Sequence, residues 1–173
     1  MSQPAGVDAR VLRMREAFDR AFAVAAAGGE AFEDMLAIRV AGDAYALRVG
    51  EIKGVLASRK IVPLPSKRRE LLGVAGVRGS LVAVYSLAAL LGYELDREPP
   101  SWLVLAGSPE PIGLGFSGLE GFVRARRADI HAGLPGEGAR LHLAEVVGTG
   151  TGSRPVVDIT SALGALALFT KES

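Results

Sequence analysis

The sequence predicts a mainly β protein built from two similar small barrels, and two observations carry this prediction. Residues 35–60 align with residues 102–127 without a gap, and residues 84–87 align with residues 156–159, at offsets of 67 and 72 positions. Both halves also contain many short apolar runs separated by glycine-containing turns. A repeat of this length indicates duplicated subdomains. Short strands with few helices favour closed or nearly closed barrels, which leave no sheet edge unpaired.

The duplication divides the chain into three predicted parts. Residues 1–30 form a mostly helical N-terminal extension, residues 31–98 a first β-barrel subdomain, and residues 99–173 a second one with a short C-terminal helix. In the extension, apolar side chains recur every three or four positions from Val7 to Ala25, and two glycines follow. This stripe fits a helix that packs on the protein's own core or one that docks on a partner.

Local patterns place the individual elements. Paired apolar runs predict turns at residues 42–43 and at Arg78-Gly79-Ser80. A short helical segment closed by Gly92 follows the second turn, and Thr160 is expected near the N-cap of the C-terminal helix. The expected strands are residues 35–40, 45–49, 55–62, 71–77, 81–85 and 154–159, and the expected helices are residues 87–91 and 160–169.

Composition limits the class of function. Apolar residues make up 49% of the chain and charged residues 23%, so a sizeable core can be buried. The net charge of +1 argues against a strongly basic nucleic-acid binder. The basic clusters at residues 67–69 and 124–127 fit solvated faces or contacts with an acidic partner or a membrane surface. The absence of cysteine excludes disulfides and thiolate metal sites, and it is compatible with a reducing cytoplasm.

Neither a membrane span nor a secretory signal is expected. The longest uncharged run, residues 79–93, is shorter than a spanning helix needs. Acidic residues interrupt the basic stretch near the N-terminus, where a secretory signal would carry positive charge alone.

Motifs with known chemistry lack the context that this chemistry needs. Residues 113–118 fit G-x-G-x-x-G, but the repeat aligns them with a strand and its turn, without a crossover helix. Residues 148–152 lack a phosphate-binding lysine and predict a hairpin connection. His131 and His142 do not have the i,i+4 spacing of a helical metal site, and no nucleophile elbow accompanies them. The sequence therefore predicts no catalytic residues, no metal and no cofactor.

The stretch from residue 71 to residue 92 resembles the central signature of the CheW family of chemotaxis coupling proteins. Residues 72–79 read LGVAGVRG and residues 81–87 read LVAVYSL. The family pattern is roughly G-V-x-N-x-R-G, followed by an apolar strand that ends P-V-V-D-L. The resemblance extends from about residue 35 to residue 168. It implies two tandem SH3-like five-stranded β-barrels, packed around a shared apolar core, in a protein that is not an enzyme.

The same resemblance implies an adaptor that acts in the cytoplasm at receptor arrays. Its implied partners are the cytoplasmic tip of a methyl-accepting chemoreceptor and the regulatory domain of a CheA-type histidine kinase, with no nucleic acid and no membrane insertion. Gly54, Gly76 and Ser86 stand where the family favours an acidic residue, asparagine and aspartate. A divergent scaffold for another receptor–kinase array, in surface motility or development, is therefore one alternative. A small-molecule-binding β-barrel is another, although no convergent polar set supports it.

Four residues form the candidate protein-binding set. Arg78 projects from a predicted turn, and its guanidinium can engage two acceptors at once, while Gly79 permits a positive φ. The resemblance puts Arg78 in a groove that accepts a receptor helical hairpin; the alternative is that Arg78 braces its own loop. Ile52 and Val55 complete the set, and their apolar repeat partners leave a role in the core equally open.

Overall fold

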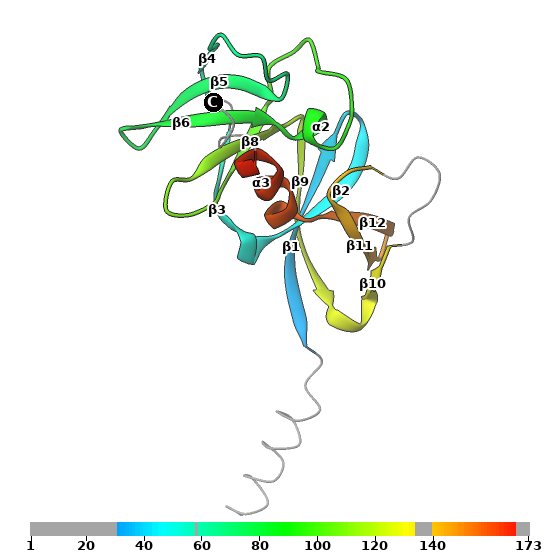
Figure 1. Ribbon diagram of the computed structural model, residues 1–173. Helices are drawn as coiled ribbons and strands as arrows, with labels where there is room; N and C mark the ends of the chain where they lie inside the picture. Colours follow the sequence, from blue (N-terminus) through cyan, green and yellow to red (C-terminus); the bar gives the residue numbers. More distant parts are fainter. Residues whose placement is uncertain (1–30, 58, 134–139, 169–173) are drawn as a thin grey trace, which may run out of the picture. The chain divides into compact units, whose positions relative to one another are not determined.

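The computed structural model describes residues 31–57, 59–133 and 140–168, and the predicted N-terminal helix lies outside them (Figure 1). Within these ranges the chain forms twelve strands, two α-helices and two 3-10 turns. The strands are β1 (Phe32–Val40), β2 (Asp43–Arg48), β3 (Ile52–Ala57), β4 (Ile61–Val62), β5 (Leu71–Val77), β6 (Ser80–Ser86), β7 (Trp102–Ala106), β8 (Ile112–Phe116), β9 (Gly118–Arg126), β10 (Ile130–Ala132), β11 (Leu143–Thr149) and β12 (Gly152–Val157). The helical elements are η1 (Val49–Glu51), α2 (Leu87–Leu90), η2 (Arg127–Asp129) and α3 (Ile159–Leu168).

The strands form two six-stranded sheets, which confirms the mainly β prediction. Sheet 1 has the order β10-β11-β12-β2-β1-β9, and sheet 2 has the order β3-β7-β8-β6-β5-β4. Neighbouring strands are antiparallel, except that β12 runs parallel to β2 and β6 runs parallel to β8. Each sheet has one strand more than the five expected, because the short strands β4 and β10 pair at its edge.

Both sheets coil on themselves into barrels. In sheet 2, one buried cluster combines Val77 of β5, Val82 of β6 and Leu105 of β7, although β8 separates β6 from β7 in the sheet. A matching cluster fills sheet 1 and combines residues of β1, β2, β9, β11 and β12. Such contacts between distant strands require a curled sheet, as in a small barrel whose interior is filled by side chains.

The two copies of the repeat exchange strands. In chain order, β7, β8 and β9 repeat β1, β2 and β3, while β11, β12 and α3 repeat β5, β6 and α2. However, β3 pairs with β7 of the other copy, and β9 pairs with β1. Each sheet therefore joins the first hairpin of one copy to the later strands of the other. The boundary expected near residue 98 separates the two sequence copies, whereas each sheet draws on both sides of it.

Irregularities in the strand ladders recur at equivalent places. Lys53 interrupts the register of β3 on β7, and Glu120 interrupts that of β9 on β1. Leu72 interrupts the register of β5 on β6, and Ala144 that of β11 on β12. These pairs follow the two offsets of the sequence repeat. Because a bulge bends a strand and increases its twist, the coincidence indicates that both copies follow one strand plan, as the repeat predicts.

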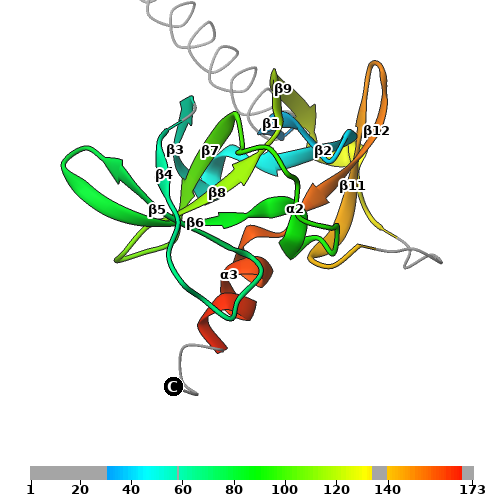
Figure 2. The same cartoon turned by 90° about the horizontal axis from the view of Figure 1, so that it is seen from above.

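The largest buried cluster combines side chains of both sheets. It includes residues of β1 and β2 from sheet 1, β7 and β8 from sheet 2, and both α-helices. Leu36, Leu47, Val104 and Leu114 are fully buried there, and each contributes roughly 1.5–3 kcal/mol of burial free energy. Figure 2 shows α2 where the strands of the two sheets approach each other. The shared core therefore holds the two barrels together.

The turn predicted at residues 42–43 lies one residue earlier. Ala41 and Gly42 both have a positive φ, of 51° and 89°, and Asp43 already begins β2. Two central residues with positive φ are typical of the type I′ turn, whose twist suits a two-residue hairpin.

The C-terminal helix likewise begins one residue earlier than predicted, and Thr160 lies near its N-cap as expected. Helix α3 begins at Ile159, and the Asp158 carboxylate accepts a hydrogen bond from the Ser161 N–H at 2.8 Å. Asp158 is thus the N-cap, and Thr160 lies inside the helix. The sequence pattern placed Asp158 in the preceding strand, and the local signals for the end of a strand and a helix cap overlap there.

Candidate functional site

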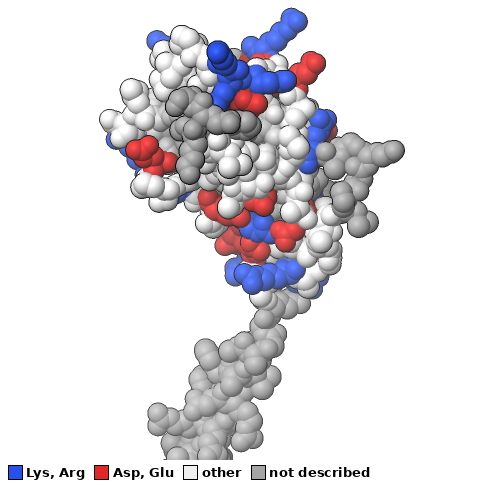
Figure 3. Space-filling view, in the orientation of Figure 1, with Lys and Arg blue, Asp and Glu red and all other residues white. Residues whose placement is uncertain are grey.

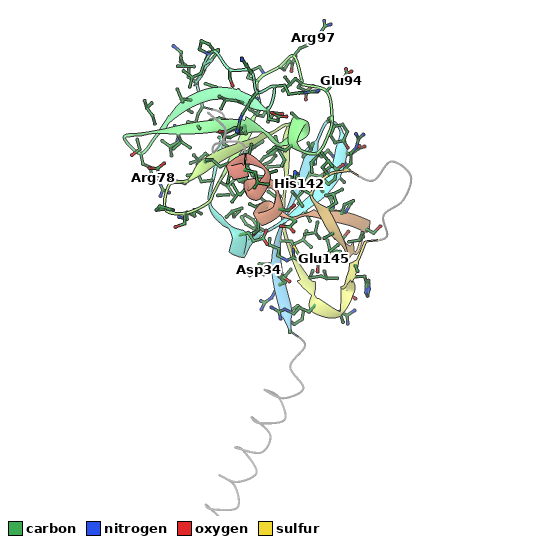
Figure 4. All side chains as sticks on the ribbon, in the orientation of Figure 1. Asp34, Arg78, Glu94, Arg97, His142 and Glu145 are labelled. Atoms are coloured by element: carbon green, nitrogen blue, oxygen red, sulfur yellow. The ribbon has the colours of Figure 1, made fainter. Side chains whose placement is uncertain are left out.

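Arg78 and Gly79 form the turn between β5 and β6. Their φ angles are 50° and 82°, so this is a second type I′ turn, and both residues are exposed. Figure 4 shows Arg78 at the tip of this hairpin, away from His142 on the other side of α3. The positive φ expected for Gly79 is present. The positive φ of Arg78 is a finding that no sequence signal indicated, because only glycine adopts it without cost.

The position of Gly76 has room for a side chain. A Cβ added to Gly76 would meet nothing within 4 Å in the described chain, and its φ lies outside the left-handed region. The residue is exposed on β5, two positions before Arg78. The asparagine that the family pattern favours would therefore fit there, and glycine is not required by this backbone.

Ile52 and Val55 lie on β3 and are partly buried against the core shared by the two sheets. Their repeat partners on β9 behave differently from each other. Leu119 packs against the same core, whereas Phe122 is 72% exposed. Leu119 is therefore part of the core. Phe122 is not, because it is a large apolar side chain on the surface of an edge strand.

The four predicted site residues fall into two pairs. Ile52 and Val55 share one strand, while Arg78 and Gly79 share one hairpin turn. The two pairs belong to sheet 2 and adjoin one small buried cluster, which includes Val77 before Arg78 and against which Leu56 beside Val55 packs. The structure records no contact between Arg78 and either apolar residue in the part of the chain that it describes.

A charged network joins β1, β2 and β11, and sequence analysis missed it. Arg48 donates from Nε to the Glu33 carboxylate at 2.7 Å and also pairs with Glu145. Burial raises the pKa of the neighbouring Glu51 carboxyl, against the attraction of Arg48 and a hydrogen bond from the Ile159 backbone. One oxygen of Glu51 is buried without a hydrogen-bond partner. No sequence signal marks this network, because its members lie far apart in the chain.

A second polar cluster surrounds Tyr93, just after α2. Its hydroxyl donates to the Asp43 carboxylate and lies 2.6 Å from the Tyr45 hydroxyl. Burial, followed by the hydrogen bond to Asp43, raises the pKa of Tyr93. The Arg140 guanidinium lies over the Tyr93 ring, 3.6 Å from its centre. These contacts tie β2, the end of α2 and the segment before β11 together, which gives the cluster a structural role.

Residues 34–164 match the model of the CheW-like domain, well over half of the chain. The chain belongs to the CheW-like family. Over 83 residues it is 28% identical to the chemotaxis protein CheW of Thermotoga maritima. This alignment covers 48% of the chain and about half (54%) of that relative's length. The scaffolding protein TtCheW of Thermoanaerobacter tengcongensis has a similar fold, with a TM-score of 0.64 at 14% identity over 72% of this chain and 88% of that one.

The alternative motifs of this CheW-like chain have structural explanations. Residues 113–118 form most of β8 and the start of β9, and no helix follows them as a dinucleotide site requires. Residues 148–152 form the β11–β12 hairpin. No group of three or more metal-ligating side chains gathers within the described ranges. No helix described is long and apolar enough to span a bilayer.

His142 does lie beside a serine, which sequence analysis did not anticipate. Its Nδ1 is 2.8 Å from the Ser161 hydroxyl, and burial lowers the pKa of His142. Ser161 occupies the first turn of α3, where its N–H is bound by Asp158. A catalytic triad needs a carboxylate that orients the histidine through its other nitrogen, and no such hydrogen bond occurs among the described residues. The pair fits a contact between α3 and the loop before β11.

Proposed function

We propose that this CheW-like protein is a non-catalytic adaptor that couples chemoreceptor tips to the regulatory domain of a CheA-type histidine kinase in the cytoplasm. The observation that carries the proposal is the CheW-like domain over residues 34–164. The names of the two relatives, a chemotaxis protein and a scaffolding protein, support the same role.

The proposed receptor contacts are Arg78 with Gly79 and the apolar residues of β3 and β9. No hydrogen bond or ion pair in the described chain ties Arg78 to its own loop, which favours an outward role for its guanidinium. Val55 and its repeat partner Phe122 offer apolar surface on the edge strands of the two sheets. An amphipathic receptor helix can cover such surface with its apolar face.

The proposed kinase contact is barrel against barrel. The resemblance implies that the kinase regulatory domain is itself a similar barrel, so two sheets would meet through exposed apolar strand residues. Leu81 on β6 is 78% exposed and is one such residue. An interface of standard size would bury roughly 1,200–2,000 Å² in total.

The test uses the purified full-length chain, the regulatory domain of a histidine kinase and a soluble receptor-tip hairpin, all from one organism. We expect calorimetry to show binding of both partners and gel filtration to show one complex of all three, without phosphoryl transfer by the chain alone. Phe122→Ala should weaken receptor binding about tenfold, or about 1.4 kcal/mol, with an unchanged melting temperature because Phe122 is 72% exposed. Leu141→Ala, at a different exposed apolar residue, is the matched control. Failure to bind either partner, or phosphoryl transfer by the chain alone, contradicts the proposal.

A divergent scaffold for a different receptor–kinase array is the second candidate. The observation that favours it is Gly76, which is exposed near the Arg78 turn. The family pattern favours asparagine at this position, and among the described residues the space for that side chain is empty. Gly76→Asn separates the two candidates. Under the first, it strengthens binding to a chemotaxis receptor tip. Under the second, it leaves that binding weak, and the tip of the other array binds more tightly to the wild-type chain.

A further inference from the structure

A groove of about 480 Å³ lies between the two helices and the loops that precede β5 and β11. Its floor is apolar, with Leu90 of α2 and Leu166 of α3 almost completely buried. Leu141 lies at its edge and keeps 60% of its surface exposed. The groove therefore offers an apolar surface that a side chain of leucine size can cover.

The rim of this groove is basic. One side of the groove is lined by three consecutive basic residues, Lys67, Arg68 and Arg69. Glu70 is the one acidic residue among the described residues that line the groove. Arg68 donates to the Leu166 carbonyl at 3.3 Å, while Lys67 and Arg69 are exposed. On the face shown in Figure 3, basic side chains gather at the top, over the loop that leads from β4 to β5. Positive charge is thus concentrated beside an apolar floor.

The walls of the groove are held by equivalent contacts from both copies of the repeat. Arg68 binds the carbonyl of Leu166 in α3, and Arg140, its equivalent 72 positions later, binds the Gly92 carbonyl just after α2 at 3.4 Å. Each loop also accepts a hydrogen bond from the residue that caps a helix. The Ser86 N–H donates to the Glu70 carbonyl at 2.7 Å, and the Asp158 N–H donates to the His142 carbonyl at 2.8 Å. A groove with fixed walls loses little conformational freedom on binding.

We propose that this groove binds an acidic amphipathic segment of a partner protein. One leucine-sized side chain would lie against Leu90 and Leu141, and carboxylates would lie beside Lys67 and Arg69. The volume falls within the range of about 300–1,000 Å³ typical of ligand sites. An apolar floor with a one-sided basic rim matches an amphipathic helix that carries acidic residues next to its apolar stripe. None of these four residues belongs to the receptor and kinase contacts proposed above.

The test measures fluorescence anisotropy with a fluorescein-labelled peptide of repeating Glu-Glu-Leu-Leu units and with its counterpart in which lysine replaces glutamate. The acidic peptide should bind the full-length chain, and its Kd should rise with salt concentration. Lys67→Glu and Leu141→Asp should each raise this Kd at least tenfold. Arg127→Glu and Leu95→Asp are the matched controls at other exposed positions, and both should bind the peptide as the wild type does. Leu141→Ser replaces Leu141→Asp if the aspartate lowers the melting temperature.

Five results would overturn the proposal. Equal affinity for the lysine peptide, or unchanged affinity in both groove variants, removes the charge and apolar complementarity on which it rests. Binding to phosphatidylglycerol vesicles without binding of the acidic peptide assigns the surface to a membrane. A tenfold gain in peptide affinity after removal of residues 169–173 assigns the groove to the chain's own segment. Self-association that is lost in Leu141→Asp assigns it to a second copy.

Discussion

Arg78 combines an unfavourable backbone conformation with an exposed side chain. A φ of 50° brings the Cβ of any residue other than glycine close to its own backbone, at a cost of about 1–2 kcal/mol. Its equivalent in the other hairpin of the first copy, at Ala41, shows that the type I′ turn alone can impose this conformation. The turn therefore accounts for the backbone, and the choice of arginine calls for a reason outside the fold.

Replacement of Arg78 should separate folding from binding. Arg78→Gly relieves the positive φ but loosens the unfolded chain, so the free energy of unfolding should stay within about 1 kcal/mol of the wild type. Arg78→Ala keeps the φ cost and removes the same guanidinium. Both variants should weaken receptor binding about thirtyfold, since an interface arginine can contribute on the order of 2 kcal/mol. Arg97→Ala, at an exposed arginine between the two copies, is the control.

Urea unfolding and receptor titration of these variants check the prediction. A Gly variant that unfolds at much lower urea, while the protein that remains folded binds normally, would make Arg78 a brace for its own loop.

Glu51 is a residue whose charge opposes folding. Burial raises its pKa above the ordinary value, with further contributions from the nearby charges of Asp158 and Glu33. The folded state therefore binds the Glu51 proton more tightly than the unfolded state does. This contribution to stability is fully present below the ordinary pKa of a glutamate and is lost as pH rises through the higher folded value.

Glu51→Gln should consequently unfold at higher urea than the wild type at pH 7.5, and the difference should shrink toward pH 4. Glutamine keeps an oxygen that can accept the hydrogen bond from the Ile159 backbone, so the change removes charge rather than the contact. Glu94→Gln, at an exposed position, is the control and should show no such trend. A Glu51→Gln variant that is less stable at both pH values would mean that the attraction between the Glu51 carboxylate and Arg48 outweighs the cost of burying its charge.

At the scale of elements, both helices start on equivalent capping residues. The Ser86 hydroxyl accepts from the Ala89 N–H at 3.2 Å, and Asp158, 72 positions later, accepts from the Ser161 N–H. Serine and aspartate are among the best N-caps, so Ser86 departs from the family's aspartate without loss of this function. The aspartate expected at this point of the signature is thus explained by helix capping.

Asp158→Ala should therefore lower the free energy of unfolding by about 1 kcal/mol. Thr160→Ala should change it by less than about 0.5 kcal/mol, because Thr160 is an exposed residue inside α3 rather than its cap. Thermal unfolding followed by circular dichroism measures both. An equal loss of unfolding free energy in the two variants would contradict the assignment of Asp158 as the N-cap.

At the scale of the whole folded unit, the strand exchange makes each copy of the repeat incomplete. The hairpin β1–β2 lies between β9 and β12, which both belong to the second copy, and β7–β8 lies between β3 and β6 of the first. A chain that ends near residue 98 would therefore leave its first hairpin and its later strands without their sheet neighbours. Unpaired strands of this kind expose backbone groups and apolar surface.

We expect residues 1–98 and 99–173, expressed as separate chains, to be unfolded alone and to form a native-like complex when mixed. The reason is that each sheet needs strands from both fragments. Dispersion of backbone amide signals in heteronuclear NMR spectra measures folding of each fragment and of the mixture. A dispersed spectrum from residues 1–98 alone would show that one copy forms a barrel by itself and would contradict this expectation.

The sequence by itself determined the fold class, the duplication and the family. These follow from local quantities: the spacing of apolar residues, the glycines of the hairpins and the offset between the copies. The turn at Arg78 and Gly79 could be predicted for the same reason, since turn type depends on a few adjacent residues. Even so, the predicted start of the C-terminal helix and the predicted first turn each differ from the structure by one residue, at Ile159 and Ala41, because neighbouring residues satisfy the same local preferences.

Only the tertiary structure decided which copy each strand pairs with and which apolar residues stay exposed. The two copies have similar apolar patterns, so β3 could pair within its own copy or with β7 without any change in local sequence. Exposure likewise depends on what covers a strand, which is why Phe122 stands on the surface although its repeat partner Val55 is partly buried. The Arg48 network and the groove between the helices combine residues from both copies. Their partners are distant in the chain, and only the folded arrangement brings them together.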